Sequence, residues 1–142
     1  MSIQPPPIYE ILSGEDGKPK LPWIVFFNSV YNGDAGLNWT PNFESLGVSG
    51  TPTITGRYYR LSQYLVFFRV TVIPDTNTTS TAGTTYIDNF PLVFSADGAC
   101  IAVSGNLGAT PGHIVASNNR IYTPGWTAAT VPVTVLGIGE AG

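Results

Sequence analysis

The feature that most constrains the fold is a two-residue alternation between positions 64 and 73. Arg69 and Thr71 interrupt the odd-numbered positions, whereas the even-numbered ones are all apolar: Tyr64, Val66, Phe68, Val70 and Val72. Side chains along a β-strand point alternately to the two faces of a sheet, so this pattern predicts a strand with one face in a core. A similar periodicity runs from residue 37 to the end of the chain, which predicts a sheet protein there.

Short turns separate the expected strands. Asp97-Gly98, Asn118-Asn119 and Pro124-Gly125 are typical turn pairs, and turns this close together favour antiparallel hairpins over parallel strands joined by helices. The expected strands cover residues 38–46, 53–61, 64–73, 84–93, 99–104, 112–117, 120–123 and 130–139. The Ser- and Thr-rich tract 76–85 is expected to be an exposed loop. The fold class predicted is all-β, an antiparallel, jelly-roll-like β-sandwich of about eight strands.

The N-terminal region differs from the rest. Residues 5–7 are three consecutive prolines, which favour an extended arm. Residues 21–31 predict one short amphipathic helix whose apolar side chains are Trp23, Phe26, Phe27 and Val30. Because a helix of about ten residues is marginal in water, these side chains need a burial site, either on their own sandwich or against other chains. The predicted organisation is an attachment and oligomerisation segment, 1–36, followed by a sandwich domain, 37–142.

Charge and composition exclude several kinds of partner. The net charge is −3 with 6 scattered Lys and Arg residues, which provide no field that would hold a phosphate backbone, so nucleic acid is not expected. The longest apolar run, 23–27, is far shorter than the roughly 20 residues of a membrane span, and residues 1–7 do not resemble a signal peptide. Cys100 is the only cysteine and cannot form an internal disulfide, which suits synthesis in a reducing cytoplasm.

The sequence carries no convincing catalytic or cofactor motif. His113 is the only histidine and lies in a predicted strand, and Cys100 is expected to be an inert, small apolar residue. One histidine and one cysteine do not make a zinc site. Residues 105–108 are glycine-rich but lack the lysine of a phosphate-binding loop. A glycosidase would need two facing carboxylates, for which the candidates are Asp34, Glu44, Asp75, Asp88 and Asp97. All of these except Glu44 lie in apparent turns, which explain an aspartate by backbone geometry alone. The chain is therefore expected to be a non-enzyme without cofactor or metal.

Large aromatic rings leave binding as the more plausible role. Core or interface packing explains most such rings, although exposed rings beside amide side chains also stack against sugars. The rings in question are Trp39, Tyr58, Tyr59, Tyr86, Tyr122 and Trp126. The best local cluster comprises Asn118, Asn119, Tyr122 and Trp126, which is the predicted glycan or receptor contact.

Several short motifs resemble a known group of proteins. Residues 56–68, GRYYRLSQYLVFF, resemble the G-x-Y-x-R-x-G-x-x-V-x-F segment of small β-sandwich domains in virion proteins of tailed bacteriophages, with Ser62 in place of the second glycine. Residues 87–91, IDNFP, resemble the I-x-N-L-P strand end of these domains, and 136–141, LGIGEA, resemble their closing strand. Residues 23–27, WIVFF, are similar to the W-x-x-F-F stretch that precedes them.

The resemblance implies a non-enzymatic virion structural protein, made in the host cytoplasm and displayed on the particle. The leading expectation is a tail-associated fibre, tip or adaptor component in contact with a host-surface glycan. Alternatives are a capsid decoration or head-fibre protein and, more remotely, a glycan-cleaving tail enzyme. The expected partners are two further copies in a homotrimer, through Trp23, Phe26, Phe27 and Val30, and other virion proteins through the arm.

Overall fold

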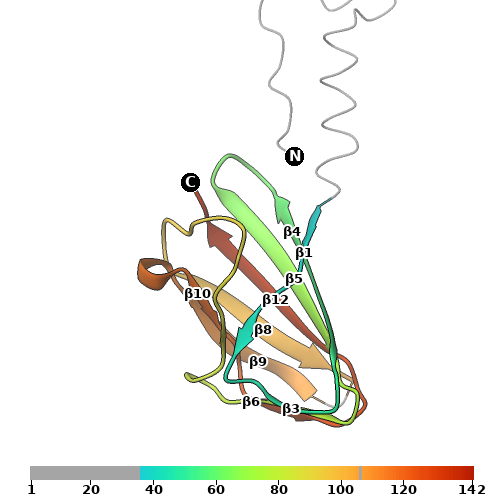
Figure 1. Ribbon diagram of the computed structural model, residues 1–142. Coiled ribbons are helices and arrows are strands. Elements are labelled where there is room, and N and C mark those ends of the chain that lie inside the picture. The colour runs from blue at the N-terminus through green and yellow to red at the C-terminus, as the bar shows by residue number, and fades with distance from the viewer. Residues whose placement is uncertain (1–35, 106) are drawn as a thin grey trace, which may run out of the picture.

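Nine antiparallel strands form one curled sheet in the computed structural model, which describes residues 36–105 and 107–142 (Figure 1). The spatial order is β1-β4-β5-β12-β8-β9-β10-β7-β2, and a second sheet has the order β11-β6-β3. The strands are β1 Leu37–Trp39, β2 Phe43–Glu44, β3 Gly47–Ser49, β4 Thr53–Arg60, β5 Leu65–Ile73, β6 Asn77–Ser80, β7 Tyr86–Ile87, β8 Gly98–Ser104, β9 Leu107–Val115, β10 Arg120–Tyr122, β11 Trp126–Ala128 and β12 Val133–Glu140. A single 3-10 turn, Ala116–Asn118, is the helical part of the described chain.

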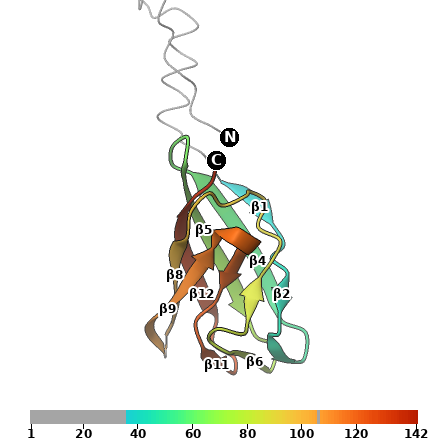
Figure 2. The same ribbon diagram turned by 90° about the vertical axis from the view of Figure 1, so that its left-hand side faces the viewer.

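The predicted all-β antiparallel sandwich is confirmed. The large sheet curls so that its two halves face each other across the core. The small sheet lies at the end of the sandwich opposite the C-terminus (Figures 1 and 2). The predicted arm and short helix, with Trp23, Phe26, Phe27 and Val30, lie outside the described residues.

The core follows the alternation of β5. Val66, Phe68, Val70 and Val72 are fully buried, and β12 adds Val133 and Val135 from the neighbouring strand. The Phe68 ring packs against Phe90 and against the indole of Trp39, with ring centroids 5.5 Å and 6.5 Å away. Tyr64 was expected on the same buried face, but it precedes the strand and is 57% exposed.

The tract expected to be an exposed loop is partly core. Residues 77–80 form β6, in which Thr78 and Ser80 are buried, and Thr85 beyond it is buried as well. Their hydroxyls find partners inside the protein, since the Oγ of Ser80 lies 2.8 Å from Oγ1 of Thr123 and the Thr85 hydroxyl donates to the Ser45 carbonyl. Buried hydroxyls are tolerated when they are hydrogen-bonded, which is why this polar tract can lie inside.

Other boundaries also differ from the expected ones. The expected strand 38–46 is divided into β1 and β2, and the expected strand 84–93 is reduced to β7 because the chain then leaves the sheet. The side chain of Asn89 fixes this irregular stretch. Its Oδ1 accepts a hydrogen bond from the backbone N–H of Asn42, and its Nδ2 donates one to the backbone carbonyl of Thr40. Strands β3, β6 and β11 were not expected, and β9 begins earlier than expected.

Both ends of the described chain lie at the same end of the sandwich. Figures 1 and 2 show the start of β1 and the C-terminus together, away from β6 and β11. The amide of Ala141 donates to the carbonyl of Tyr64 at 2.7 Å, which attaches the C-terminal residues beside the β4–β5 turn. Anything joined through residue 36 is therefore attached at this end.

Candidate functional site

A row of aromatic side chains crosses the outer face of β9, β10 and β7. The sheet register places His113 and Tyr86 on either side of Tyr122, each directly opposite it on a neighbouring strand. The rings of His113 and Tyr122 stack nearly parallel, with centroids 5.1 Å apart and planes inclined by 10°. The rings of Tyr122 and Tyr86 lie 5.4 Å apart at 50°. We call these three residues, together with Arg120, the aromatic ledge.

Arg120 supplies the positive charge of the ledge. It lies two residues before Tyr122 on β10, so both side chains emerge on the same face. Its guanidinium carbon is 4.1 Å from the centroid of the Tyr86 ring, which is a close cation–π contact, and the guanidinium also hydrogen-bonds to Tyr122. The Asn118 amide donates a second hydrogen bond to the Tyr122 hydroxyl at 3.4 Å.

These two hydrogen bonds change the acidity of the phenol. The guanidinium of Arg120, and to a smaller extent the amide of Asn118, lower the pKa of Tyr122 below its ordinary value because they favour the phenolate. The same pairing raises the pKa of Arg120, which therefore remains a cation. The ledge thus presents a permanent positive charge beside two tyrosine rings.

Hydrogen-bond acceptors border the ledge beyond Tyr86. Glu44 lies opposite Tyr86 on β2, and Asp88 follows the end of β7. Nδ2 of Asn42 donates to Oε1 of Glu44 and to Oδ1 of Asp88, each at 2.9 Å. The amide therefore lies between the two carboxylates and fixes their position at the edge of the rings.

The structure divides the cluster that was predicted as a glycan contact. Asn118 and Tyr122 are brought together at the surface, as described above. Asn119 instead has a structural role, since its Oδ1 accepts from the Phe94 amide at 2.8 Å and its Nδ2 donates to the Leu92 carbonyl at 3.1 Å. Its backbone is left-handed, with φ of 54°, a conformation that asparagine tolerates well.

Trp126 was wrongly placed at the surface. Only 4% of the residue is exposed, its indole N–H donates to Thr78 at 3.2 Å, and its ring packs against Phe43. The ledge instead contains Tyr86, which was named among the large rings but not in the predicted cluster, and His113 and Arg120, which were not expected to bind. Their cross-strand register has no local sequence signal, although the Arg-x-Tyr spacing in β10 could have indicated a shared face.

The remaining candidate residues have structural explanations. Burial raises the pKa of the Cys100 thiol to about 12, which makes a thiolate nucleophile unavailable at neutral pH. The carboxylates of Asp75 and Asp97 accept hydrogen bonds from the backbone amides of Thr51 and Ala116. Asp34 lies outside the described residues.

Neither the described residues nor known proteins add a further functional signal. In residues 36–105 and 107–142, no three His, Cys, Asp or Glu side chains are grouped so that they could hold a metal ion. No helix in this part of the chain has the length and apolar character needed to cross a membrane. Comparison with known proteins finds no family model, no curated protein and no solved structure that matches the chain significantly.

Proposed function

We propose that the protein is a non-enzymatic virion structural component of a tailed bacteriophage, a tail-associated fibre, tip or adaptor protein that contacts a host-surface glycan. The observation that carries the glycan contact is the aromatic ledge. The virion assignment rests on the short motifs in residues 56–68, 87–91 and 136–141, which lie in a fold of the expected class. Attachment through residue 36 leaves the far end of the sandwich and the face that carries the ledge available for contact.

The ledge has the components of a shallow sugar site. Apolar C–H faces of a pyranose stack on flat rings, and its hydroxyls need both donors and acceptors. His113 offers a ring whose neighbour on β8 is Ala99, which has only a methyl group, so that face of the imidazole has room beside it. Asn118 and Arg120 supply donors, while the carboxylates held by Asn42 supply acceptors.

Such an open site binds a single sugar weakly, and repetition compensates for this. Dissociation constants near 1 mM correspond to only about −4 kcal/mol. A particle that carries several copies binds a repeating polysaccharide with much higher avidity, without any additional contact in each site. A surface ledge is therefore a suitable geometry for a multivalent structural protein.

The arrangement of the carboxylates supports a binding role over hydrolysis. A glycosidase holds its two carboxylates on either side of the bond that it cleaves. Here the amide of Asn42 occupies the space between Glu44 and Asp88 and bonds to both. The carboxylates border an open surface, and Asp88 is exposed.

Adsorption of the purified protein to host cells tests the proposal, with competition by isolated host polysaccharide. His113→Ala and Arg120→Gln should each weaken binding about tenfold, equivalent to about 1.4 kcal/mol. Tyr64→Ala is the matched control, because it removes an exposed ring outside the ledge and should leave binding unchanged. Wild-type binding that survives both ledge variants, or that polysaccharide does not compete, would contradict the glycan role, and release of sugar would contradict the non-enzymatic one.

The virion assignment is tested by locating the chain in intact particles. A tail position is expected. Particles that contain none of the chain would refute the assignment, and copies at capsid symmetry axes would select the capsid decoration alternative.

A further inference from the structure

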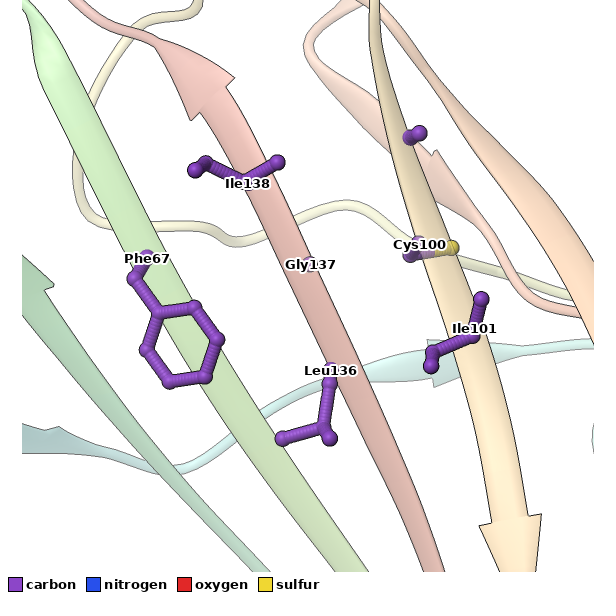
Figure 3. Close-up of a pocket in the computed structure, with 7 residues that line it drawn as sticks. Phe67, Cys100, Ile101, Leu136, Gly137 and Ile138 are labelled. Atoms are coloured by element: carbon purple, nitrogen blue, oxygen red, sulfur yellow. The ribbon is translucent and has the colours of Figure 1, made fainter. Parts of the chain in front are cut away.

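A second surface on the outer face of the sheet is apolar. Phe67 of β5, Leu136 and Ile138 of β12, and Ala99 and Ile101 of β8 lie next to one another across three neighbouring strands (Figure 3). The register pairs Phe67 with Ile138 and Ile138 with Ala99, and it pairs Leu136 with Ile101. Together they line a shallow groove of about 360 Å³. We call these five residues the apolar strip.

The apolar strip is unusual for the outer side of a sandwich. Solvated faces of antiparallel sheets are normally polar, as Thr71 and Thr134 are in the adjacent row. Yet Ile101 is 39% exposed and Ile138 is 45% exposed, both in central strands of the sheet. A partner that covers the strip removes this apolar surface from water, which favours its binding.

The chain enters the described fold beside this surface. Gly36 lies on the outer side of β4, where a Cβ atom on it would come within 2.6 Å of Cε1 of Tyr59 and 2.8 Å of Nε of Arg57. The ring of Tyr59 is 5.9 Å from that of Phe67, the first side chain of the strip. One aromatic ring therefore separates the point of entry from the apolar strip.

The sequence before Gly36 contains a matching segment within reach. Residues 21–31, LPWIVFFNSVY, carry no charged side chain and include Trp23, Phe26, Phe27 and Val30. The five Cα steps from Tyr31 to Gly36 span up to about 17 Å. This exceeds the offset from β1 to β12, which is three strand spacings of roughly 4.8 Å each.

We propose that residues 21–31 dock on the apolar strip of their own chain. Both surfaces are apolar, and the short connection keeps the segment at an effective concentration in the millimolar range, above that of a second copy at micromolar concentration. The docked segment would cover Ile101 and Ile138 and bury the rings that a short helix cannot bury alone. This role does not depend on the glycan contact, although the two surfaces adjoin, because Ala99 of the strip lies directly opposite His113 of the ledge.

Paramagnetic broadening in the full-length protein tests the docking. A spin label is attached at Asn28→Cys, a polar position of the segment, while the native Cys100 is buried and remains unlabelled. We expect the label to broaden the backbone amide signals of Ile101 and Ile138 at all protein concentrations. In a second sample, the spin-labelled chain carries no ¹⁵N and is mixed with ¹⁵N-labelled wild-type chain. We expect no such broadening in this mixed sample.

Two variants complete the test. The double variant Ile101→Ser/Ile138→Ser should abolish the broadening along the strip, whereas Ile73→Ser should retain it. Ile73 is a matched control because it is 44% exposed on β5 but lies outside the strip. Absence of broadening in the parent protein would overturn the proposal. Broadening in the mixed sample would overturn it as well and would identify a second copy as the occupant, as expected for a homotrimer built on Trp23, Phe26, Phe27 and Val30.

Discussion

Gly137→Ala should strongly destabilise the sandwich, although it adds a single methyl group to a strand. Gly137 lies opposite Phe68, where β12 pairs with β5. A Cβ atom at this position would overlap the Phe68 ring, with Cε2 only 2.9 Å away. The ring is fully buried and packs against Phe90 and Trp39, so moving it would disturb these neighbours.

The expected cost follows from two limits. Overpacking a core costs about 1–3 kcal/mol, and displacing a phenylalanine ring altogether costs about 3–5 kcal/mol. Replacing glycine by alanine returns about 0.5–1 kcal/mol by restricting the unfolded chain. We therefore expect a net loss of about 3 kcal/mol in the free energy of unfolding, or a fall of about 10 °C in Tm for a chain of this size.

Urea denaturation of four proteins measures this cost as a double-mutant cycle. Phe68→Leu removes the ring atoms that the methyl group would meet, so Gly137→Ala should be nearly neutral in that background. Gly47→Ala is the matched control, since a Cβ there lies 3.4 Å from Thr79, an ordinary contact. Equal losses for Gly137→Ala in the presence and absence of the Phe68 ring would refute the steric explanation, as would no loss at all.

Three further predictions concern single side chains. Tyr122 should ionise at a lower pH than an ordinary tyrosine in an ultraviolet absorbance titration, and Arg120→Gln should raise its pKa toward the ordinary value; an unchanged titration would contradict the hydrogen bond between them. Cys100 should resist a thiol reagent in the native state and react after unfolding. Since burial raises its pKa from 9.0 to about 12, its contribution to stability should be complete below pH 9 and be lost as the pH rises toward 12, a loss that Cys100→Ala should abolish. Asn119→Ala should cost about 2 kcal/mol in unfolding experiments, because two backbone groups lose their partner and the left-handed backbone is strained; an equal effect of Asn118→Ala would contradict this assignment.

The local sequence pattern was sufficient to predict burial where a residue's environment depends only on its own strand. The alternation predicted five positions on one buried face, and the four within β5, from Val66 to Val72, are buried because strand geometry alone sends every second side chain to the same face. The turn pattern at Asp75 and Asp97 did not indicate their partners, because their carboxylates accept hydrogen bonds from the backbone amides of Thr51 and Ala116, which lie 24 and 19 positions away.

The local sequence pattern did not predict burial where a side chain depends on a partner far away in the sequence. Thr78 and Ser80 read as loop residues, yet they are buried because Trp126 and Thr123 provide hydrogen-bond partners more than forty positions away. Trp126 read as a surface ring for the same reason, since a tryptophan in a turn-rich stretch gives no indication of what covers it.

The amino-acid sequence by itself determined that this chain is a sheet protein with a valine-rich strand at its core and an apolar segment before residue 36. Tertiary structure alone decided which side chains share a surface. His113, Tyr122 and Tyr86 form one ledge, and Phe67, Ile138 and Ala99 form one row, because strands from distant parts of the chain pair in a particular order and register. Such pairings depend on contacts between residues far apart in sequence, and a one-residue change of register would send every one of these side chains to the opposite face.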